Sequence, residues 1–359
     1  MRTNTRCLII PTIAIFVALC ANCTQAQNSL SPQENAPSRP ENAPSQQQSK
    51  LPLKLVVDVP LSGNASRLDY QSFDAASGRL YIAHLADSML TVFDVKTQKI
   101  VGDVKGLKNV HGVIAVPELH RIYATATGTN ELAVIDDRTL EVVARVPAGN
   151  YPDGVAYASK EKKLYVSDLH GNTDTVIDAV TNKVVATIAL DAPAGNTQYD
   201  AVTDRVFVSV HKLNAIIEID PQTDKIVGTY PLAGCESPHG LLIDGANRFA
   251  FAACEDNATL AMFDLTSKKL LAIYATGDDP DVLAFDVELK RLYVAAESGD
   301  LAIFDEKKNA LESVGRGFYV AKTHTVAVDS NTHLVYLPLE NLDGKPVLRI
   351  VRPLDKSTK

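Results

Sequence analysis

Pairs of apolar residues recur along the chain at an almost constant spacing. Each pair opens a short apolar segment, and successive pairs lie 42, 42, 42, 43, 43 and 43 residues apart. The pairs are Leu80-Tyr81, Ile122-Tyr123, Leu164-Tyr165, Val206-Phe207, Phe249-Ala250, Leu292-Tyr293 and Val335-Tyr336. A spacing this regular predicts seven copies of one supersecondary unit.

Each copy contains short β-type segments separated by turn residues. In the second copy we expect strands at 112–116, 121–126, 132–136 and 142–146. Four strands in a repeat of ~42 residues, without helical periodicity, predict an all-β fold. Aspartates end the third strands, and a threonine follows three positions later, which is typical of a side-chain-closed turn. We interpret these aspartates as structural: Asp94, Asp136, Asp178 and Asp220.

The seventh copy has only three predicted strands, near 325–328, 334–337 and 347–351. Residues 54–59 match residues 99–104, the fourth strand of the first copy. We therefore expect the N-terminal strand to complete the last blade and to close the ring, which removes an open sheet edge. The predicted fold is a seven-bladed β-propeller with four antiparallel strands per blade.

The first 50 residues differ in character from the repeats. Arg2 and Arg6 precede an apolar run at 7–21, which is the pattern of a secretory signal peptide, and small residues favour cleavage after Ala26. An uncleaved anchor and lipidation at Cys20 or Cys23 are alternatives. The expected organisation is a signal peptide at 1–26, a disordered Pro/Ser/Gln-rich linker at 27–50, the propeller at 51–353 and a tail at 354–359. The predicted location is periplasmic or secreted.

Composition narrows the range of partners. The formal net charge is −8, tryptophan is absent and aromatic residues make up 6%. These values argue against a nucleic-acid partner. After the first 25 residues no apolar run is long enough to cross a bilayer, so we expect no transmembrane domain. We also expect a monomer.

The repeats resemble a known family. Leu-Tyr-Val-Ser at 164–167, Val-Ile-Asp at 176–178 and Val-Val-Ala-Thr-Ile at 184–188, with their echoes in other copies, are similar to YVTN-type (YncE-like) β-propellers. The resemblance covers roughly 51–353 and implies an exported propeller. It implies little about activity, because one fold hosts many functions.

A polar column precedes the apolar pairs. Eleven residues before each pair, or ten in the fifth copy, stand Asp69, His111, Asp153, Gly195, His239, Asp281 and His324. This position is the start of each innermost strand, so we expect the column to surround one mouth of the central channel. Residues two positions apart lie on the same side of an extended strand. We therefore expect a second row of side chains on that side, two positions before the column: Arg67, Asn109, Tyr151, Pro193, Ser237, Asp279 and Lys322.

Arg67 and Lys322 belong to neighbouring blades in a closed ring. They predict a cationic corner that could hold a carboxylate or a phosphate, or they are two solvated surface cations. The loops between second and third strands should open on the same face, with His84, Asp87, Asp168, His170, His211, Glu255 and Glu297. His120 and His333 are expected at turns on the opposite face.

The column contains the side chains that divalent metals use. The predicted ligand-binding set is Arg67, Asp69, His111, Asp153, His239, Asp281, Lys322 and His324, with His111, His239 and His324 as candidate ligands of a divalent metal. A wet polar channel is the plainer interpretation. Apart from a candidate divalent metal, the cofactor stays unknown.

The sequence lacks the usual catalytic and haem-attachment motifs. Two function classes stay open, besides a pure scaffold. One is a non-catalytic exported propeller that binds a small ligand or a protein partner at one channel mouth. The other is a metal-assisted hydrolase or lyase, for example one acting on a lactone. Whether the protein is an enzyme is not decided by these patterns.

Export also bears on the cysteines. After cleavage at Ala26 only Cys235 and Cys254 remain. They flank the first two strands of the fifth copy and should meet on the ring face. In an oxidising compartment they are expected to form a disulfide.

Overall fold

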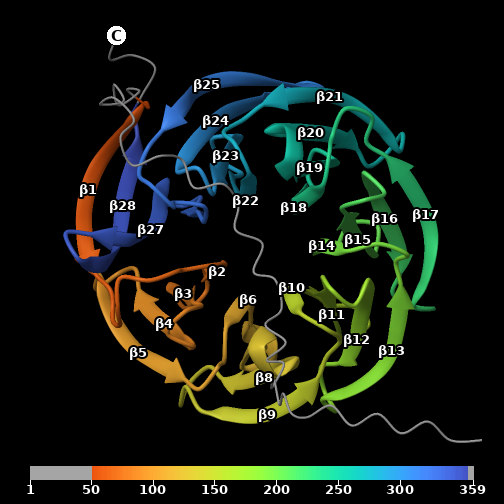
Figure 1. Cartoon of the computed structure of the whole chain (residues 1–359), viewed down its shortest axis with the longest axis horizontal. Helices are drawn as coiled ribbons and strands as arrows, with labels where there is room; N and C mark the ends of the chain where they lie inside the picture. The colour runs from red at the N-terminus through yellow and green to blue at the C-terminus, as the bar shows by residue number, and fades with distance from the viewer. Residues whose placement is uncertain (1–50, 355–359) are drawn as a thin grey trace, which may run out of the picture. The chain divides into compact units, whose positions relative to one another are not determined.

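The computed structural model describes residues 51–354. This part of the chain forms 28 strands in seven four-stranded antiparallel sheets, arranged as blades around a central channel (Figure 1). The predicted seven-bladed β-propeller is therefore confirmed. The predicted signal peptide and linker at 1–50 lie outside the described residues, as do residues 355–359 of the tail.

Each blade contributes one strand to each of four concentric layers. The innermost strands are β2 (Gln71–Asp74), β6 (Val110–Val116), β10 (Pro152–Ala158), β14 (Ala194–Asp200), β18 (Pro238–Asp244), β22 (Pro280–Asp286) and β26 (Ala327–Asp329). The second strands are β3 (Arg79–His84), β7 (Arg121–Ala126), β11 (Lys163–Asp168), β15 (Arg205–Val210), β19 (Phe249–Cys254), β23 (Arg291–Ala296) and β27 (Leu334–Leu342).

The third strands are β4 (Met89–Asp94), β8 (Glu131–Asp136), β12 (Thr173–Asp178), β16 (Ala215–Asp220), β20 (Thr259–Asp264), β24 (Asp300–Lys307) and β28 (Lys345–Pro353). The outer strands are β5 (Lys99–Lys105), β9 (Val142–Pro147), β13 (Lys183–Ala189), β17 (Lys225–Pro231), β21 (Lys269–Ala275), β25 (Ala310–Phe318) and β1 (Leu53–Pro60). Three short 3₁₀ turns are η1 (Pro117–Leu119), η2 (Thr127–Thr129) and η3 (Glu255–Asn257).

The first strand of the chain belongs to the last sheet. β1 pairs antiparallel with β28, and in Figure 1 the orange-red strand lies beside the blue one. Arg349 of β28 donates two hydrogen bonds to the Asp58 carboxylate of β1, at 2.8 and 2.7 Å. The two ends of the described chain are thus joined within one blade, by a sheet ladder and a bidentate ion pair.

The core lies between neighbouring blades. Buried apolar residues form seven clusters, and one of them joins Leu80 and Phe93 of the first blade to Tyr336 and Leu348 of the seventh. The second and third strands are buried along most of their length, whereas the outer strand β13 is largely exposed. Each blade therefore depends on both neighbours for burial of its apolar faces.

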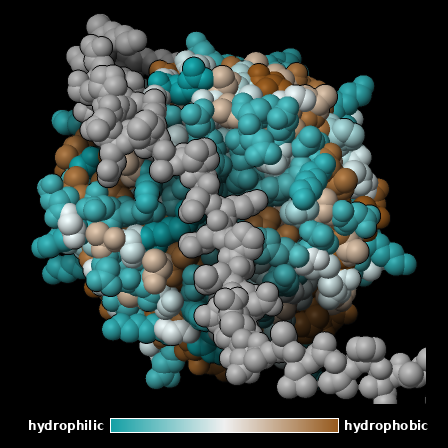
Figure 2. Space-filling model, viewed as in Figure 1, coloured by the Kyte–Doolittle hydropathy of each residue, from teal (hydrophilic) through white to brown (hydrophobic). Residues whose placement is uncertain are grey.

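The surface is polar, in contrast to the apolar clusters between the blades. Hydrophilic side chains predominate where described residues are visible in Figure 2. Among residues 51–354, no helix is long and apolar enough to cross a membrane.

The aspartates that end the third strands close turns, as predicted. Asp94 accepts a hydrogen bond from the backbone N–H of Thr97 at 2.8 Å, and Asp178 accepts one from Thr181 at 2.7 Å. These bonds stabilise the carboxylate form and lower the pKa of Asp178. The aspartates have a structural role in shaping the blade edges.

A disulfide joins Cys235 and Cys254, whose Cα atoms are 5.3 Å apart. The predicted pairing is confirmed. Cys235 precedes β18 and Cys254 ends β19, so the bond ties the approach to the inner strand of the fifth blade to the end of its second strand.

Candidate functional site

The polar column lies at a recurring irregularity of the innermost strands. In five blades the pairing of first and second strands shifts register at this position, for example between Val110 and Val113 and between Pro238 and Leu241. A β-bulge of this kind inserts extra residues and redirects a side chain. Asp69 and His324 differ, because they precede their short inner strands β2 and β26.

Glycines beside the column allow the inner strands to approach one another. A Cβ atom at Gly240 would collide with the carbonyl oxygen of Asp281 in the next blade, and one at Gly112 would collide with that of Asp153. Only glycine permits this approach of backbone to backbone. The close packing brings His239 of the fifth blade near Asp281 of the sixth.

Most of the predicted ligand-binding residues share one cavity of about 240 Å³ at the channel mouth. Arg67, Asp69, His111, Asp153, His239 and Asp281 line it, together with Tyr70, Tyr151, Leu169, Glu255, Asp279 and Glu297. Lys322 and His324 are not among the lining residues. The cavity thus presents six carboxylates, and its only lysine or arginine is Arg67.

Five of the seven positions two residues before the column do not have the extended geometry that we predicted. Asn109, Tyr151, Ser237, Asp279 and Lys322 all have left-handed backbones, with φ between 49° and 62°. They form tight turns into the inner strands, so the alternation of a β-strand does not apply to them. The extended geometry is therefore wrong for these five, although Tyr151 and Asp279 of this row still line the cavity, as does Arg67.

The predicted cationic corner is neutralised by acidic neighbours. Arg67 donates to Glu297 at 2.6 Å, and its Nε lies 3.5 Å from a carboxylate oxygen of Asp69. The Lys322 ammonium lies 4.0 Å from Glu340, and its side chain is 72% exposed. Neither cation faces an empty anion site, because each is next to a carboxylate.

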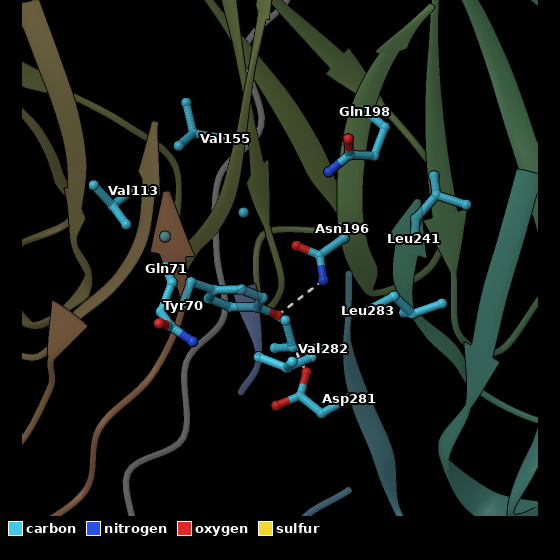
Figure 3. Close-up of a pocket in the computed structure, with 14 residues that line it drawn as sticks. Tyr70, Gln71, Val113, Val155, Asn196, Gln198, Leu241, Asp281, Val282 and Leu283 are labelled. Carbon is cyan, nitrogen blue, oxygen red and sulfur yellow. Dashed lines mark hydrogen bonds between the residues drawn. The ribbon is translucent and has the colours of Figure 1, made fainter. Parts of the chain in front are cut away.

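Tyr70 crosses the channel and separates the mouth from the deeper interior. Its hydroxyl accepts a hydrogen bond from the Asn196 amide at 2.8 Å and contacts His239 Nε2 at 2.9 Å and Asp281 at 3.4 Å. Figure 3 shows this hydroxyl directed toward Asn196 and Asp281. Below it lies a second cavity of about 120 Å³, where Val113, Val155 and Leu241 are among the lining residues.

His239 is at the centre of the acidic mouth. Its Nε2 lies 3.4 Å from Asp153 and 3.7 Å from Asp281, and its Nδ1 lies 3.6 Å from Glu255. Burial alone would lower the pKa of His239, but Glu255, Asp153 and Asp281 together raise it to about 9. The mouth therefore favours a positive charge at this imidazole.

A second histidine extends the cluster. His211 Nε2 lies 2.9 Å from His239 Nδ1, and His211 Nδ1 lies 3.8 Å from Glu255. Burial and the charge of His239 lower the pKa of His211 to about 3, while burial raises the pKa of Glu255 to about 7. His211, His239 and Glu255 are spaced so that one metal ion could contact all three.

The three histidines predicted as metal ligands are divided among different neighbourhoods. His239 belongs to the group just described, and His324 forms another possible metal group with Asp281 and Glu297. His111 belongs to neither group: its Nε2 lies 3.1 Å from the Tyr151 hydroxyl. The structure does not bring His111, His239 and His324 together around one ion.

His324 is buried and unusually isolated. Only 1% of its surface is exposed, and neither ring nitrogen has a hydrogen-bond partner among the described residues. Its Nδ1 lies 3.6 Å from Glu297, whose other oxygen accepts from Arg67. Asp281, the third member of this possible metal group, is buried as well, and burial raises the pKa of its carboxyl well above the usual value.

The remaining polar residues of the loops have structural partners. His84 is buried beside Ser66, at 3.0 Å, and Asp168 accepts from Thr173 and Thr175 at 2.9 and 2.6 Å. The His170 ring packs against Tyr151 at an angle of 45°, with ring centroids 4.3 Å apart. His120 and His333 have left-handed backbones, as expected for turn residues.

Sequence reasoning missed Leu169, which lines the mouth cavity, and two residues at its floor, Tyr70 and Asn196. Each of these two floor residues directly follows a column position, Asp69 or Gly195. A second column, shifted by one residue, contains Gly112, Gly154 and Gly240 in other blades. A large side chain where other repeats have glycine was the available signal that the channel is obstructed there.

Comparison with known proteins identifies the fold alone. No protein-family model matches the sequence, and no curated protein does either. Among solved structures, hydrazine synthase of Kuenenia stuttgartiensis is similar with a TM-score of 0.67 at 14% identity, covering 85% of this chain and 97% of that one. U3-55K is similar with a TM-score of 0.70 at 9% identity, covering 82% of this chain and 98% of that one.

These two proteins are described by unrelated names, and their sequence identity to this chain is low. A shared propeller does not transfer function, because function depends on the residues of the site. The similarities support the fold alone, a seven-bladed β-propeller.

Proposed function

We propose that this protein is an exported, non-catalytic β-propeller that binds a small, positively charged ligand at the acidic mouth of its central channel. The observation behind this proposal is the six carboxylates of the mouth cavity, against Arg67 as its one lysine or arginine. Buried like charges raise one another's pKa, and a bound cation relieves that repulsion.

Several features support the sign of the ligand charge. Burial raises the pKa of Asp153, Asp279 and Asp281, and neighbouring carboxylates raise each further. Arg67 is already occupied by Glu297 and Asp69. Six carboxylates face two positive groups in the mouth cavity, the guanidinium of Arg67 and the charged imidazole of His239, so acidic groups are in excess. An anion would have to displace carboxylates from Arg67.

Export and family membership form part of the same proposal. The basic and apolar pattern of the first 26 residues is that of a secretory signal peptide. The Cys235–Cys254 disulfide suits a periplasmic or secreted protein. The repeat motifs resemble those of the YVTN-type propellers, and our proposal places the chain in that family.

Ligand binding to the mature protein tests the proposal. We would measure melting temperature and calorimetric binding with a linear diamine, an amino sugar, Zn²⁺, citrate and phosphate. Cations should stabilise the protein by mass action, and the two anions should not. Stabilisation by an anion alone, or by no cation of this panel, contradicts the proposal.

Two neighbouring aspartates provide a matched pair of variants. Asp279 lines the mouth cavity, whereas Asp278 lies outside it. Asp279→Asn should weaken cation binding, because it removes a negative charge from the mouth. Asp278→Asn makes the same chemical change one residue away and should leave binding nearly intact.

A metal-assisted hydrolase or lyase is the second candidate function. It is favoured by the two groups of possible metal ligands at the mouth. Assays with simple lactones and esters, with and without added Zn²⁺, would test it. Metal-dependent turnover that is lost on removal of His239 would favour the enzyme.

A further inference from the structure

We propose that His211, His239 and Glu255 form a binding site for a divalent transition-metal ion of the Zn²⁺ type. This inference rests on the proposed function, since it names the cation that the acidic mouth takes. The site differs from the one expected from the sequence, because it shares only His239 with the predicted triad.

The spacing of the three side chains fits one small ion. Zn–N bonds of about 2.0–2.1 Å and Zn–O bonds of similar length place tetrahedral ligand atoms roughly 3.3 Å apart. His211 Nε2 and His239 Nδ1 are 2.9 Å apart, and His239 Nδ1 and Glu255 Oε1 are 3.6 Å apart. These two distances lie within a few tenths of an ångström of the ligand spacing, and all three ligand atoms lie within 4.8 Å of one another.

The identity of the donors selects the class of metal. Two imidazoles and one carboxylate suit Zn²⁺ and similar first-row ions, whereas Ca²⁺ and Mg²⁺ prefer all-oxygen sites. Three protein ligands also leave a position of a tetrahedral ion open to water or to a further ligand. The adjoining mouth cavity, which Glu255 and His239 line, provides the space for it.

The second ring nitrogen of His239 is already held as metal ligands require. With Nδ1 directed at His211 and Glu255, Nε2 faces the Tyr70 hydroxyl at 2.9 Å and Asp153 at 3.4 Å. A partner on the far nitrogen fixes the orientation and tautomer of a ligating imidazole. The carboxylates that favour a charged His239 would equally favour a metal ion in the place of its proton.

The disulfide positions two of the three side chains. Cys254 directly precedes Glu255, and Cys235 lies four residues before His239. The crosslink therefore restrains the segments that bring Glu255 and His239 together. Rigid support of this kind increases affinity, because less conformational freedom is lost on binding.

The other possible metal group is less suited to an ion. One oxygen of Glu297 accepts from Arg67 at 2.6 Å, and Asp281 contacts the Tyr70 hydroxyl. A metal at Asp281, Glu297 and His324 would have to compete with the guanidinium of Arg67. The group that contains His211 has no lysine or arginine among its described hydrogen-bond and ion-pair partners.

The test is titration of chelator-treated full-length mature protein with Zn²⁺ by calorimetry, and with Co²⁺ by visible absorption. We expect one ion per chain and the strong visible bands of a four-coordinate Co²⁺ site. Loss of a partner that merely orients a ligand costs about 10–100-fold in affinity, so His211→Ala should weaken binding at least 100-fold. Glu255→Gln, which keeps the side-chain shape, should also weaken it strongly.

Two histidines outside the site are the controls. His170→Ala on the same face and His120→Ala at an opposite turn should bind Zn²⁺ as the unsubstituted protein does. Only variants whose metal-free melting temperature equals that of the unsubstituted protein are compared, so that a loss of binding does not reflect misfolding. Absence of stoichiometric binding, or undiminished binding by both His211→Ala and Glu255→Gln, would overturn the inference.

The outcome is separable from that of the proposed function. His211 does not line the mouth cavity, whereas Asp279 does. A protein that binds organic cations but no Zn²⁺ would refute the metal site and leave the proposed function standing. Zn²⁺ binding that is lost in His211→Ala, with diamine binding retained, would support both.

Discussion

The hydroxyl of Tyr70 lies 2.9 Å from Nε2 of His239, although 169 positions separate the two residues in the chain. Tyr70 belongs to the first blade and His239 to the fifth, so their contact spans the central channel. The same hydroxyl meets Asn196 and Asp281 of two further blades. One side chain thus links four blades at the floor of the mouth.

Replacement of Tyr70 by phenylalanine should destabilise the protein. Tyr70→Phe removes the hydroxyl and leaves the buried Asn196, His239 and Asp281 without that partner. An unsatisfied buried polar group costs about 1–3 kcal/mol. We expect a loss of this order in the free energy of unfolding, measured by urea denaturation.

Tyr336→Phe is the matched control for that substitution. Tyr336 is fully buried, and its hydroxyl has no hydrogen-bond partner among the described residues. Removing an unpaired hydroxyl should leave stability unchanged or increase it slightly. Equal destabilisation by the two substitutions would contradict the proposed role of Tyr70.

Removal of the first strand should destabilise the whole ring. Deletion of residues 51–60 exposes the edge of β28 and leaves Arg349 without Asp58. We expect the melting temperature to fall by more than about 5 °C, because several kcal/mol are lost. Deletion of 27–50 is the control and should have little effect. Two deletion proteins that melt together would argue against ring closure by this strand.

The disulfide should contribute to stability and be complete in the exported protein. Its loop spans 19 positions, which corresponds to about 3 kcal/mol in the chain-entropy model. Replacement of both Cys235 and Cys254 by serine should lower the free energy of unfolding by about that amount. Alkylation of the unreduced native protein, followed by intact mass, should show no modified cysteine.

Asp174 should make the protein less stable as pH rises. Burial raises the pKa of Asp174 to about 8, against an unfolded value near 4. Between these values the unfolded state releases a proton that the folded state retains, so ionisation favours unfolding by about 1.4 kcal/mol per pH unit. The contribution of the neutral carboxyl to the free energy of unfolding is fully present below about pH 4 and is lost progressively up to about pH 8.

Asp174→Asn removes this dependence while keeping an acceptor for Thr197. The stability gained by the substitution should be about 2–3 kcal/mol larger at pH 7 than at pH 5, following the same slope. Urea denaturation of both proteins at the two pH values measures the difference. A gain that does not change with pH would show that Asp174 is ionised in the folded state.

Much of the fold could be predicted from the repeat. The spacing of the apolar pairs determined the number of blades, and the match of 54–59 to 99–104 identified the strand that pairs with β28. The turn aspartates and the disulfide also followed, because each depends on residues close together within one blade. Local periodicity is a property of the sequence, so it can be recognised there.

The composition of the candidate site depended on contacts between blades. The column placed His111, His239 and His324 at one mouth, but His239 lies with His211 and Glu255, while His111 lies with Tyr151. Arg67 faces Glu297 across 230 positions, which is why the predicted anion corner is balanced. Bulges and left-handed turns decide where each side chain points, and the ring radius decides which residues meet across the channel. The sequence determined most of the residues that surround the mouth, six of the eight predicted ones. Only the tertiary structure decided which of them meet, because distances across the ring are not encoded in the spacing of the repeats.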